Sequence, residues 1–443
     1  MINAGLFAAV GVMFLAVGML QSWSVAAQIF NMGLISAIMA LGVNTQWGYA
    51  GLFNVGTMGF VALGGLAAVL VGKPPVPDAW AAGGLRILAA LALGAGTIVA
   101  AIALWKRMRP GRARALALTA LLVAGFLAYR WLYDPASLAI ERVNPAGEGY
   151  LGGINIFALG RDDQLPHADL FVLLAWPVGA LLAAGAAWII GKISLGLRSD
   201  YLAIATLGIA EIIIAVLKNE DWLTRGVKNV VGIPRPVPYE VTLQSSDWFV
   251  ALSERIGADP TTFSSLFVKL CWGVLFAVVL AVILWLSQRA LNSPWGRMMR
   301  AIRDNEEAAE AMGKDVTARH LQVFVLGSAI CGLAGAMMTT LDGQLTPGSY
   351  QPLRFTFLIW VMVIVGGSGN NWGAVLGGFL IWFLWNEVEP MGQWVMTHVT
   401  AGLEDGDLKR ALIDSAGHMR MIIMGLLLLL VLRFYPRGLI PER

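Results

Sequence analysis

About twelve apolar runs separated by short polar stretches limit the possible folds of this chain more than any other feature. A run of about 20 apolar residues is long enough to cross a bilayer as a helix. Of the 443 residues, 58% are hydrophobic and only 13% are charged, too few to cover soluble domains of that total size. The runs lie at approximately 5–20, 26–43, 57–72, 82–104, 115–132, 169–191, 201–218, 266–287, 317–341, 354–367, 370–388 and 417–432. We therefore predict an all-α polytopic membrane protein with about ten to twelve transmembrane helices in one domain over residues 1–443.

Some of these runs are shorter than a full crossing requires. The runs 57–72, 354–367 and 370–388 flank glycine-rich stretches. Irregular backbone at membrane depth is tolerated where it lines a cavity or is buried in protein. We expect some of these segments to be half-helices or re-entrant segments.

The basic residues predict the orientation of the chain. If every run crosses the membrane, both termini share one side with the loops 105–114, 192–200 and 288–316. These loops are richer in Lys and Arg than the longer opposite loops, which include 133–168 and 219–265. Lys and Arg in short loops favour the cytoplasmic side. We therefore predict that the termini and the loop 288–316 are cytoplasmic and that the loops 133–168 and 219–265 lie on the opposite side, which would be the periplasmic side of a bacterial inner membrane.

Other classes of function are excluded by the bulk composition and the missing motifs. The net charge of +3 is spread over many loops, so we expect no nucleic-acid binding. Cys271 and Cys331 lie inside apolar runs and the four histidines are scattered, which predicts no disulfide framework and no metal site. The sequence also lacks the Gly-x-x-x-x-Gly-Lys-Ser/Thr pattern of a P-loop. We expect a chain that binds no cofactor itself and catalyses no reaction, because no cluster of catalytic side chains is visible.

A glycine-rich segment at 365–373 has some features of a dinucleotide-binding turn. It follows Val361 to Val365, which could be a strand, and Glu387 and Glu389 come about twenty residues later. The spacing is Gly-x-Gly-x-x-x-Gly, however, and its flanks belong to a membrane bundle rather than to a soluble βαβ unit. We instead expect these glycines, Gly373 and Gly377 among them, to be points of close helix packing.

The loop 292–316 carries the pattern of an amphipathic helix. Ser293 followed by Pro294 predicts a helix start, and Gly313 predicts an end. Four apolar residues recur at helical spacing between charged positions, namely Met298, Ile302, Ala309 and Met312. We predict one cytoplasmic helix or two short ones. The loop could be a solvated connector, but an apolar stripe favours docking in the groove of a partner.

Polar residues inside the apolar runs are candidates for a translocation path. Asn44, Gln46, Tyr49, Asn54 and Thr57 surround Gly48, Gly51 and Gly56. These glycines are expected to break a helix and free backbone groups, either beside a path or in a polar contact between helices. Glu211 lies in the middle of the run 201–218, where an ionisable residue usually faces a bundle interior or a water-filled cavity. A path-lining role and a structural role are both open for it.

Several segments resemble a known family. Glu307, Ala308 and Ala309, followed by Gly313, resemble the EAA loop of ABC-importer permeases. Four further segments are similar to recurrent blocks of the LivM-type permease subunit of branched-chain amino acid ABC importers: Gly-Tyr-Ala-Gly-Leu at 48–52, Leu-Arg-Ser-Asp-Tyr-Leu-Ala-Ile-Ala-Thr-Leu-Gly at 197–208, Gly-Leu-Ala-Gly-Ala at 332–336, and Val-Gly-Gly-Ser-Gly-Asn-Asn-Trp-Gly at 365–373. The resemblance covers most of residues 28–380 in the same order.

The resemblance implies a permease that alternates access under the control of separate ATPases. It implies a homologous second permease subunit, two ABC ATPase subunits that hold ATP and Mg, a periplasmic binding protein and the membrane lipid as partners. The residues implied in ATPase coupling are Arg300, Arg303, Glu306, Glu307, Ala308, Ala309 and Gly313. Those assigned to the translocation path are Asn44, Gly48, Tyr49, Gly51, Asn54, Thr206, Glu211, Gly367 and Gly369.

The substrate is less strongly indicated than the family. Phe-Asn-Val-Gly-Thr at 53–57 stands where family members commonly have Leu-Ser-x-Gly-His, and 224–229 departs from the usual Gly-Gly-Pro-Asn. Branched-chain amino acids lead, with other amino acids, urea or short amides as alternatives. A secondary transporter working alone is a rival from another class. It would need acidic residues at the bilayer centre, and Glu211 is the one candidate well inside a run.

Overall fold

The computed structural model describes residues 2–147, 149–158, 168–401, 406–407, 410, 414 and 416–442. The long helices are α1 (Ile2–Leu20), α2 (Trp23–Val43), α3 (Thr57–Gly72), α5 (Leu85–Arg107), α6 (Arg112–Glu141), α7 (Ala175–Ser194), α8 (Ser199–Asn219), α12 (Pro260–Leu291), α15 (Val316–Asp342), α16 (Pro352–Gly366), α17 (Asn371–Val399) and α19 (Ala416–Phe434). Each of the predicted apolar runs lies on one of them. The prediction of an all-α polytopic membrane protein is confirmed: eight described helices are long and apolar enough to cross a membrane, fewer than the ten to twelve expected, and three shorter apolar helices accompany them.

Shorter elements fill the connections. The short α-helices are α4 (Pro77–Ala79), α9 (Asp221–Thr224), α10 (Glu240–Gln244), α11 (Asp247–Ile256), α13 (Pro294–Asp304) and α14 (Glu306–Ala311). The π-helices are Asn44–Gly48 and Trp80–Gly84, and the 3-10 helices are Ile156–Ala158, Leu170–Leu174, Gly226–Lys228 and Pro347–Ser349. Strands β1 (Val230–Val231) and β2 (Gln344–Leu345) form an antiparallel pair in which Val230 lies opposite Leu345. This pair joins the connection after α8 to the one after α15.

The short segments behave differently from one another. The helices α3 and α16 are indeed too short for a full straight crossing. Helix α17, by contrast, continues through Pro390 to Val399, well beyond the apolar run at 370–388. It is longer because Glu387 and Glu389 end the apolar run without breaking the helix. Of the predicted outer loop 133–168, residues 148 and 159–167 lie outside the described part of the chain.

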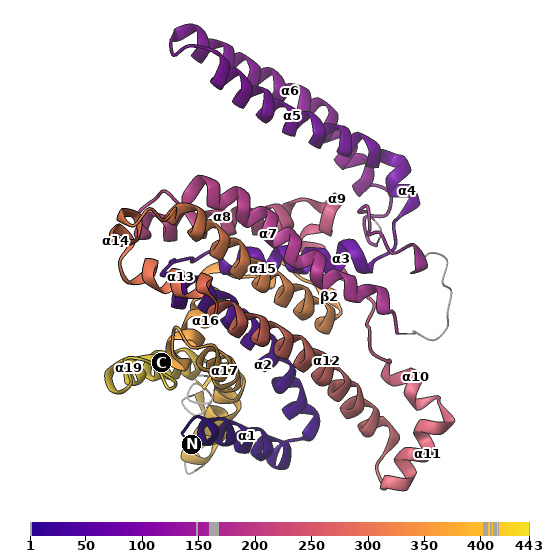
Figure 1. The fold of residues 1–443 in the computed structure, drawn as a ribbon. Coiled ribbons are helices and arrows are strands. Elements are labelled where there is room, and N and C mark those ends of the chain that lie inside the picture. The colour runs from indigo at the N-terminus through magenta and orange to yellow at the C-terminus, as the bar shows by residue number, and fades with distance from the viewer. Residues whose placement is uncertain are drawn as a thin grey trace.

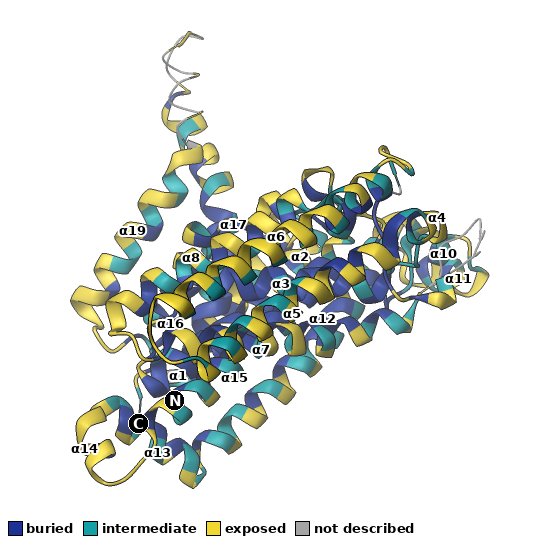
Figure 2. Cartoon of the chain, turned by 90° about the horizontal axis from the view of Figure 1, so that it is seen from above, coloured by how far each residue is buried: buried dark blue, intermediate teal, exposed yellow. Residues whose placement is uncertain are grey.

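Glycines hold the centre of the bundle together. Helix α15 packs against α7, α3 and α2, and α17 packs against α2. A Cβ added at Gly64 of α3 would lie 1.8 Å from the carbonyl oxygen of Gly332 of α15, and one at Gly377 would lie 1.9 Å from that of Met362. Such distances leave no room for a side chain, so these backbones touch directly. The buried residues cluster around α2 and α3, whereas α14 and α19 are largely exposed (Figure 2). The packing role predicted for Gly377 is confirmed.

One helical hairpin stands apart from the bundle. Helices α5 and α6 pack antiparallel on each other and project away from the other helices (Figure 1). Only the base of the hairpin has a core of its own, built around Ile87, Tyr133 and Trp222. Most of its large apolar side chains are exposed. An exposed apolar surface of this size needs lipid or another protein around it.

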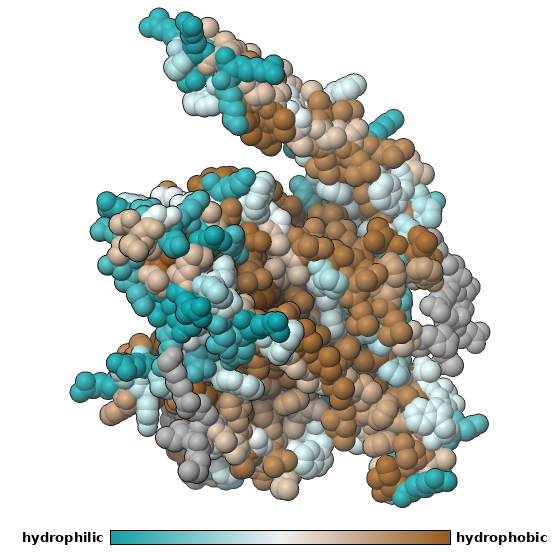
Figure 3. Space-filling view, in the orientation of Figure 1, coloured by the Kyte–Doolittle hydropathy of each residue, from teal (hydrophilic) through white to brown (hydrophobic). Residues whose placement is uncertain are grey.

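The ends of the helices divide into two groups. The turn between α5 and α6 lies toward the same end of the molecule as α13 and α14, whereas α4, α10 and α11 lie at the other end (Figure 1). Hydrophilic side chains gather around α13 and α14 and at the tip of the hairpin (Figure 3). The hairpin turn and the loop of α13 and α14, which the sequence assigns to one side, therefore lie toward the same end of the molecule.

Candidate functional site

The loop after α12 forms two short helices, the second of the alternatives that the sequence allowed. Pro294 is in the first turn of α13, directly after Ser293. Asn305 separates the helices and caps α14, because its Oδ1 accepts a hydrogen bond from the amide of Ala308 at 2.9 Å. Gly313 follows with a φ of +77°, a conformation that glycine adopts without strain. The predicted start and end of the segment are confirmed.

The apolar residues of this segment do not form one stripe. Ile302 and Met299 of α13 are buried within the chain, and so is Ala309 of α14, while Met312 is 80% exposed. The side chains that face outward from α14 are mainly acidic, namely Glu306, Glu307 and Glu310. The apolar face of α13 thus attaches the segment to its own bundle. What remains for a partner is an acidic surface with Met312 at its edge.

Arg303 connects α13 to two distant parts of the chain. Its Nη1 donates hydrogen bonds to the carbonyl oxygen of Gly48 and to Oε2 of Glu442, the latter at 2.9 Å. Its Nε also donates to Asp304 at 3.1 Å. Burial disfavours the charged guanidinium, but the carboxylates of Glu442 and Asp304 outweigh this effect and raise the pKa of Arg303. Arg300, one turn earlier, donates from Nη2 to the carbonyl oxygen of Leu291 at 3.2 Å and so braces α13 on α12.

Gly48 lies where α2 ends. The helix loosens into the π-helix Asn44–Gly48 and then gives way to irregular backbone, with Gly51 at a φ of +70°, before α3 begins at Thr57. This is the helix break that the glycines predicted. A Cβ on Gly48 would lie 2.2 Å from Oδ1 of Asn44 and 2.5 Å from the amide of Gly369. Position 48 therefore has no room for any side chain.

Asn44 connects the break to the glycine loop between α16 and α17. Its Oδ1 accepts from the amide of Gly369 at 2.9 Å, and its Nδ2 donates to Oδ1 of Asn371 at 3.1 Å. Gly367, at a φ of +119°, meets the C-terminal tail: a Cβ there would lie 2.2 Å from the carbonyl oxygen of Ile440. We name this set of contacts the coupling node, made of Arg303, Asn44, Gly48, the loop 367–371 and Glu442. It joins Arg303, which the resemblance assigned to ATPase coupling, to Asn44, Gly48, Gly367 and Gly369, which were assigned to the translocation path.

Other polar residues of the break are hydrogen-bonded inside the bundle. Asn54 donates to Gln46 at 2.9 Å, and Gln46 donates to Ser328 of α15 at 3.0 Å. Thr206 of α8 accepts a hydrogen bond from the amide of Val55 at 3.1 Å. These contacts hold the break against α15 and α8. Of the predicted path residues in this segment, Asn44, Gly48, Tyr49 and Asn54 are buried, whereas Gly51 is exposed.

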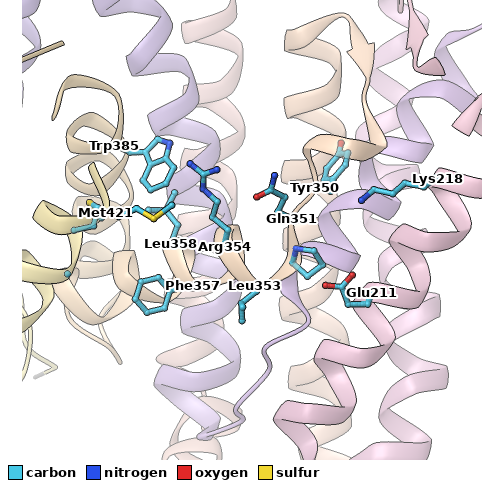
Figure 4. Close-up of a pocket in the computed structure, with 13 residues that line it drawn as sticks. Glu211, Lys218, Tyr350, Gln351, Leu353, Arg354, Phe357, Leu358, Trp385 and Met421 are labelled. Atoms are coloured by element: carbon cyan, nitrogen blue, oxygen red, sulfur yellow. The ribbon is translucent and has the colours of Figure 1, made fainter. Parts of the chain in front are cut away.

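Glu211 lies elsewhere. It is exposed on α8 and lines a cavity of about 660 Å³ formed with α16, α17 and α19. Lys218, Gln351 and Arg354 line the same cavity (Figure 4). None of the residues of the coupling node is among its walls. Glu211 therefore lies apart from the predicted path residues of the coupling node, Asn44, Gly48, Gly367 and Gly369, whereas Thr206 is on the same helix, α8.

Sequence reasoning missed several members of these sites. Glu442 belongs to a tail that has no apolar periodicity, and Arg354 stands at the first position of the apolar run 354–367, where a basic residue gives no signal of a site. Asn371 was noted only as part of a glycine-rich string. Among the described residues, no group of three or more His, Cys, Asp or Glu side chains is arranged to hold a metal ion.

Comparison with known proteins relates these features to named relatives. A model of the family described as "Branched-chain amino acid transport system / permease component" matches residues 136–432. Over 272 residues the chain is 27% identical to the high-affinity branched-chain amino acid transport system permease protein LivM of Escherichia coli (strain K12), covering 60% of this chain and 56% of that protein. It is 28% identical over 270 residues to a probable LivM of Methanocaldococcus jannaschii, covering 59% and 67%. It is 26% identical over 206 residues to LivH of Salmonella typhimurium, covering 46% and 61%.

The matches cover part of each protein. The chain spans about half the length of the Escherichia coli relative, 56%. No solved structure shows a significant match. The family match begins at residue 136, so most of the α5–α6 hairpin precedes it, whereas α7, α8, α13, α14 and α17 fall within it. Because the matched segment makes up more than half of the chain, the protein belongs to the family of branched-chain amino acid transport system permease components.

Proposed function

We propose that this chain is one permease subunit of an ATP-driven importer that carries branched-chain amino acids across the bacterial inner membrane. The observation that carries the proposal is the coupling node: Arg303 connects a short helix pair at the hydrophilic end of the bundle to the break at Gly48. A movement imposed on α13 and α14 would reach the interior of the bundle through this contact. Family membership and the substrate in the names of the relatives support the same function.

The ATPase partners would bind at α14. Its exposed carboxylates Glu306 and Glu307, with Ala308 and Gly313 beside them, form a surface that suits a basic cleft. The chain has no P-loop of its own, so ATP and Mg would be bound by two ATPase subunits. Closure of the ATPase pair would move the helix pair as a rigid body and switch access from outside to inside. This chain would supply the pathway and no catalysis.

The remaining partners follow from the arrangement of the helices. Both LivM-named and LivH-named proteins are similar to this chain, which supports pairing with a homologous second permease. A periplasmic binding protein would deliver the amino acid to the loops 133–168 and 219–265, at the end of the bundle opposite α14. The termini and the basic turn between α5 and α6 would be cytoplasmic.

Purification of the importer tests this proposal directly. The tagged chain, isolated in mild detergent, should bring its ATPase subunits with it. Glu307→Lys should abolish this recovery, because it reverses a charge on the exposed face of α14, while the chain still inserts in the membrane. Asp78→Lys makes the same type of change at an exposed acid on α4 and should leave recovery intact. A lone chain that moves leucine without ATP would instead indicate a secondary transporter.

A further inference from the structure

The cavity lined by Glu211 contains three charged side chains that form no ion pair. Among the described residues, Glu211, Lys218 and Arg354 make no hydrogen bond and no ion pair through their side chains, and Nε of Arg354 is buried with no acceptor. Glu211 lies in the middle of α8, a candidate membrane span, and Lys218 lies one residue before its end. An unpaired ionisable group in the middle of a span, such as Glu211, is costly and marks a site that receives a polar ligand or ion.

The charges come from opposite walls. Lys218 and Glu211 extend from α8 toward the side of the cavity that carries Gln351 and Arg354 (Figure 4). Arg354, at the start of α16, is held by aromatic rings: its guanidinium carbon lies 5.0 Å from the ring centre of Trp385 and 5.7 Å from that of Phe355. These contacts orient the guanidinium, and its two terminal nitrogens, which make no hydrogen bond within the described part of the chain, can bind a carboxylate.

The rest of the wall is apolar. It consists mainly of Leu353, Phe357, Leu358, Trp385, Met421 and Met424. A volume of about 660 Å³ falls within the range of about 300–1,000 Å³ that is typical of small-molecule sites. Methionine side chains adapt to apolar ligands of different shape. The cavity therefore combines a cationic group, an anionic group and a flexible apolar surface.

This combination matches one chemical class. A free amino acid with an aliphatic side chain has a carboxylate, an ammonium group and an apolar branch. We propose that the cavity is the outer binding site of the importer for such an amino acid: Arg354 binds the carboxylate, Glu211 accepts the ammonium group, and the wall of α16 and α19 receives the side chain. Lys218, nearer the end of α8, adds positive charge that attracts the carboxylate. The inference rests on the proposed function and names the site of its substrate.

The first test measures binding to the assembled permease–ATPase complex without its binding protein. The probes are L-leucine, 4-methylpentanoate, which lacks the ammonium group, and 3-methylbutylamine, which lacks the carboxylate. Arg354→Gln should lower leucine affinity about tenfold or more and leave the amine almost unaffected, because a charge-assisted bidentate contact is lost. Glu211→Gln should lower leucine affinity and leave the carboxylate probe unaffected. Arg86→Gln, on the exposed side of α5, is the matched control.

A conservative variant distinguishes binding from misfolding. Arg354→Lys keeps the charge without the planar fork, so it should recover part of the affinity that Arg354→Gln loses. Equal losses for all three probes, or leucine binding unchanged in both Gln variants, would overturn the site. A phospholipid that leaves the complex on Arg354→Gln while leucine binding persists would show a lipid headgroup site instead. If the wild type takes up leucine with ATP and the Arg354 and Glu211 variants bind leucine as the wild type does, the site is rejected and the proposed function stands. If the wild type shows no ATP-dependent leucine uptake, the proposed function is rejected.

Discussion

The guanidinium of Arg303 donates a hydrogen bond to the carbonyl oxygen of Gly48, although 255 residues separate the two in the sequence. Arg303 is on the helix pair at the hydrophilic end of the bundle, and Gly48 is where α2 loses its regular helix. A hydrogen bond from a charged donor is stronger than one between neutral groups. The contact thus gives a direct route by which displacement of α13 changes the geometry of the break.

Removal of the Arg303 side chain should uncouple movement of α13 from the helix break at Gly48. Arg303→Ala should lower ATP-dependent leucine uptake at least about tenfold, because its charge-assisted hydrogen bonds to Gly48 and Glu442 are lost and one such bond alone contributes about 1.5–3 kcal/mol. ATPase subunits should still be recovered with the chain, because the outward face of α14 is unchanged. Uptake and ATP hydrolysis in proteoliposomes measure both effects. Arg297→Ala, at an exposed position of the same helix, is the control, and equal losses in both variants would argue against a specific role of Arg303.

Glu442 should contribute to the same contact. Its carboxylate accepts from Nη1 of Arg303 at 2.9 Å, and both side chains are about one quarter exposed. Glu442→Gln should lower uptake less than Arg303→Ala does, because the amide still accepts a hydrogen bond. The double variant should be no worse than Arg303→Ala alone, since residues in one network are not additive. Uptake losses that add in the double variant would mean that the two residues act independently.

The helices were predictable from the sequence because each one depends on the composition of its own segment. The apolar runs became helices, Pro294 and Gly313 bounded the loop segment, and the glycines after α2 broke it. Each of these features depends on residues a few positions apart. The apolar stripe of 292–316 favoured docking in a partner, and this expectation was wrong for Ile302. Composition does not tell whether an apolar face packs against a partner or against its own chain. Ile302 meets its own chain.

The relations between distant segments were not predictable in the same way. The coupling node unites α13, the end of α2, the loop 367–371 and the tail. A single sequence does not show which distant segments lie side by side. It therefore gives no reason to pair Arg303 with Glu442 rather than with any other acidic residue. The separate position of the α5–α6 hairpin was equally hidden, because its apolar composition is like that of the bundle helices.

Gly48 should tolerate no larger residue. Gly48→Ala would place a methyl group within 2.5 Å of Asn44 and of the amide of Gly369, both held by hydrogen bonds. Overpacking of this kind costs about 1–3 kcal/mol, so the midpoint of thermal unfolding in detergent should fall by several degrees. Gly11→Ala, where no neighbouring atom lies within 4 Å of the new Cβ, should leave the midpoint unchanged or raise it. Equal midpoints for the two variants would contradict the packing at Gly48.

The side of the membrane on which α14 lies decides the proposed coupling. Met312 is 80% exposed, so Met312→Cys should react with a membrane-impermeant thiol reagent from the cytoplasmic side only. Val241→Cys, at a 55% exposed position on α10, should react from the periplasmic side only, because the chain places the two at opposite ends of the bundle. The parent chain is the blank, since Cys331 is buried and Cys271 partly so. Labelling of Met312→Cys from the periplasm would show that the orientation is the reverse of the one proposed. Helix α14 could then not be the site at which the ATPases bind.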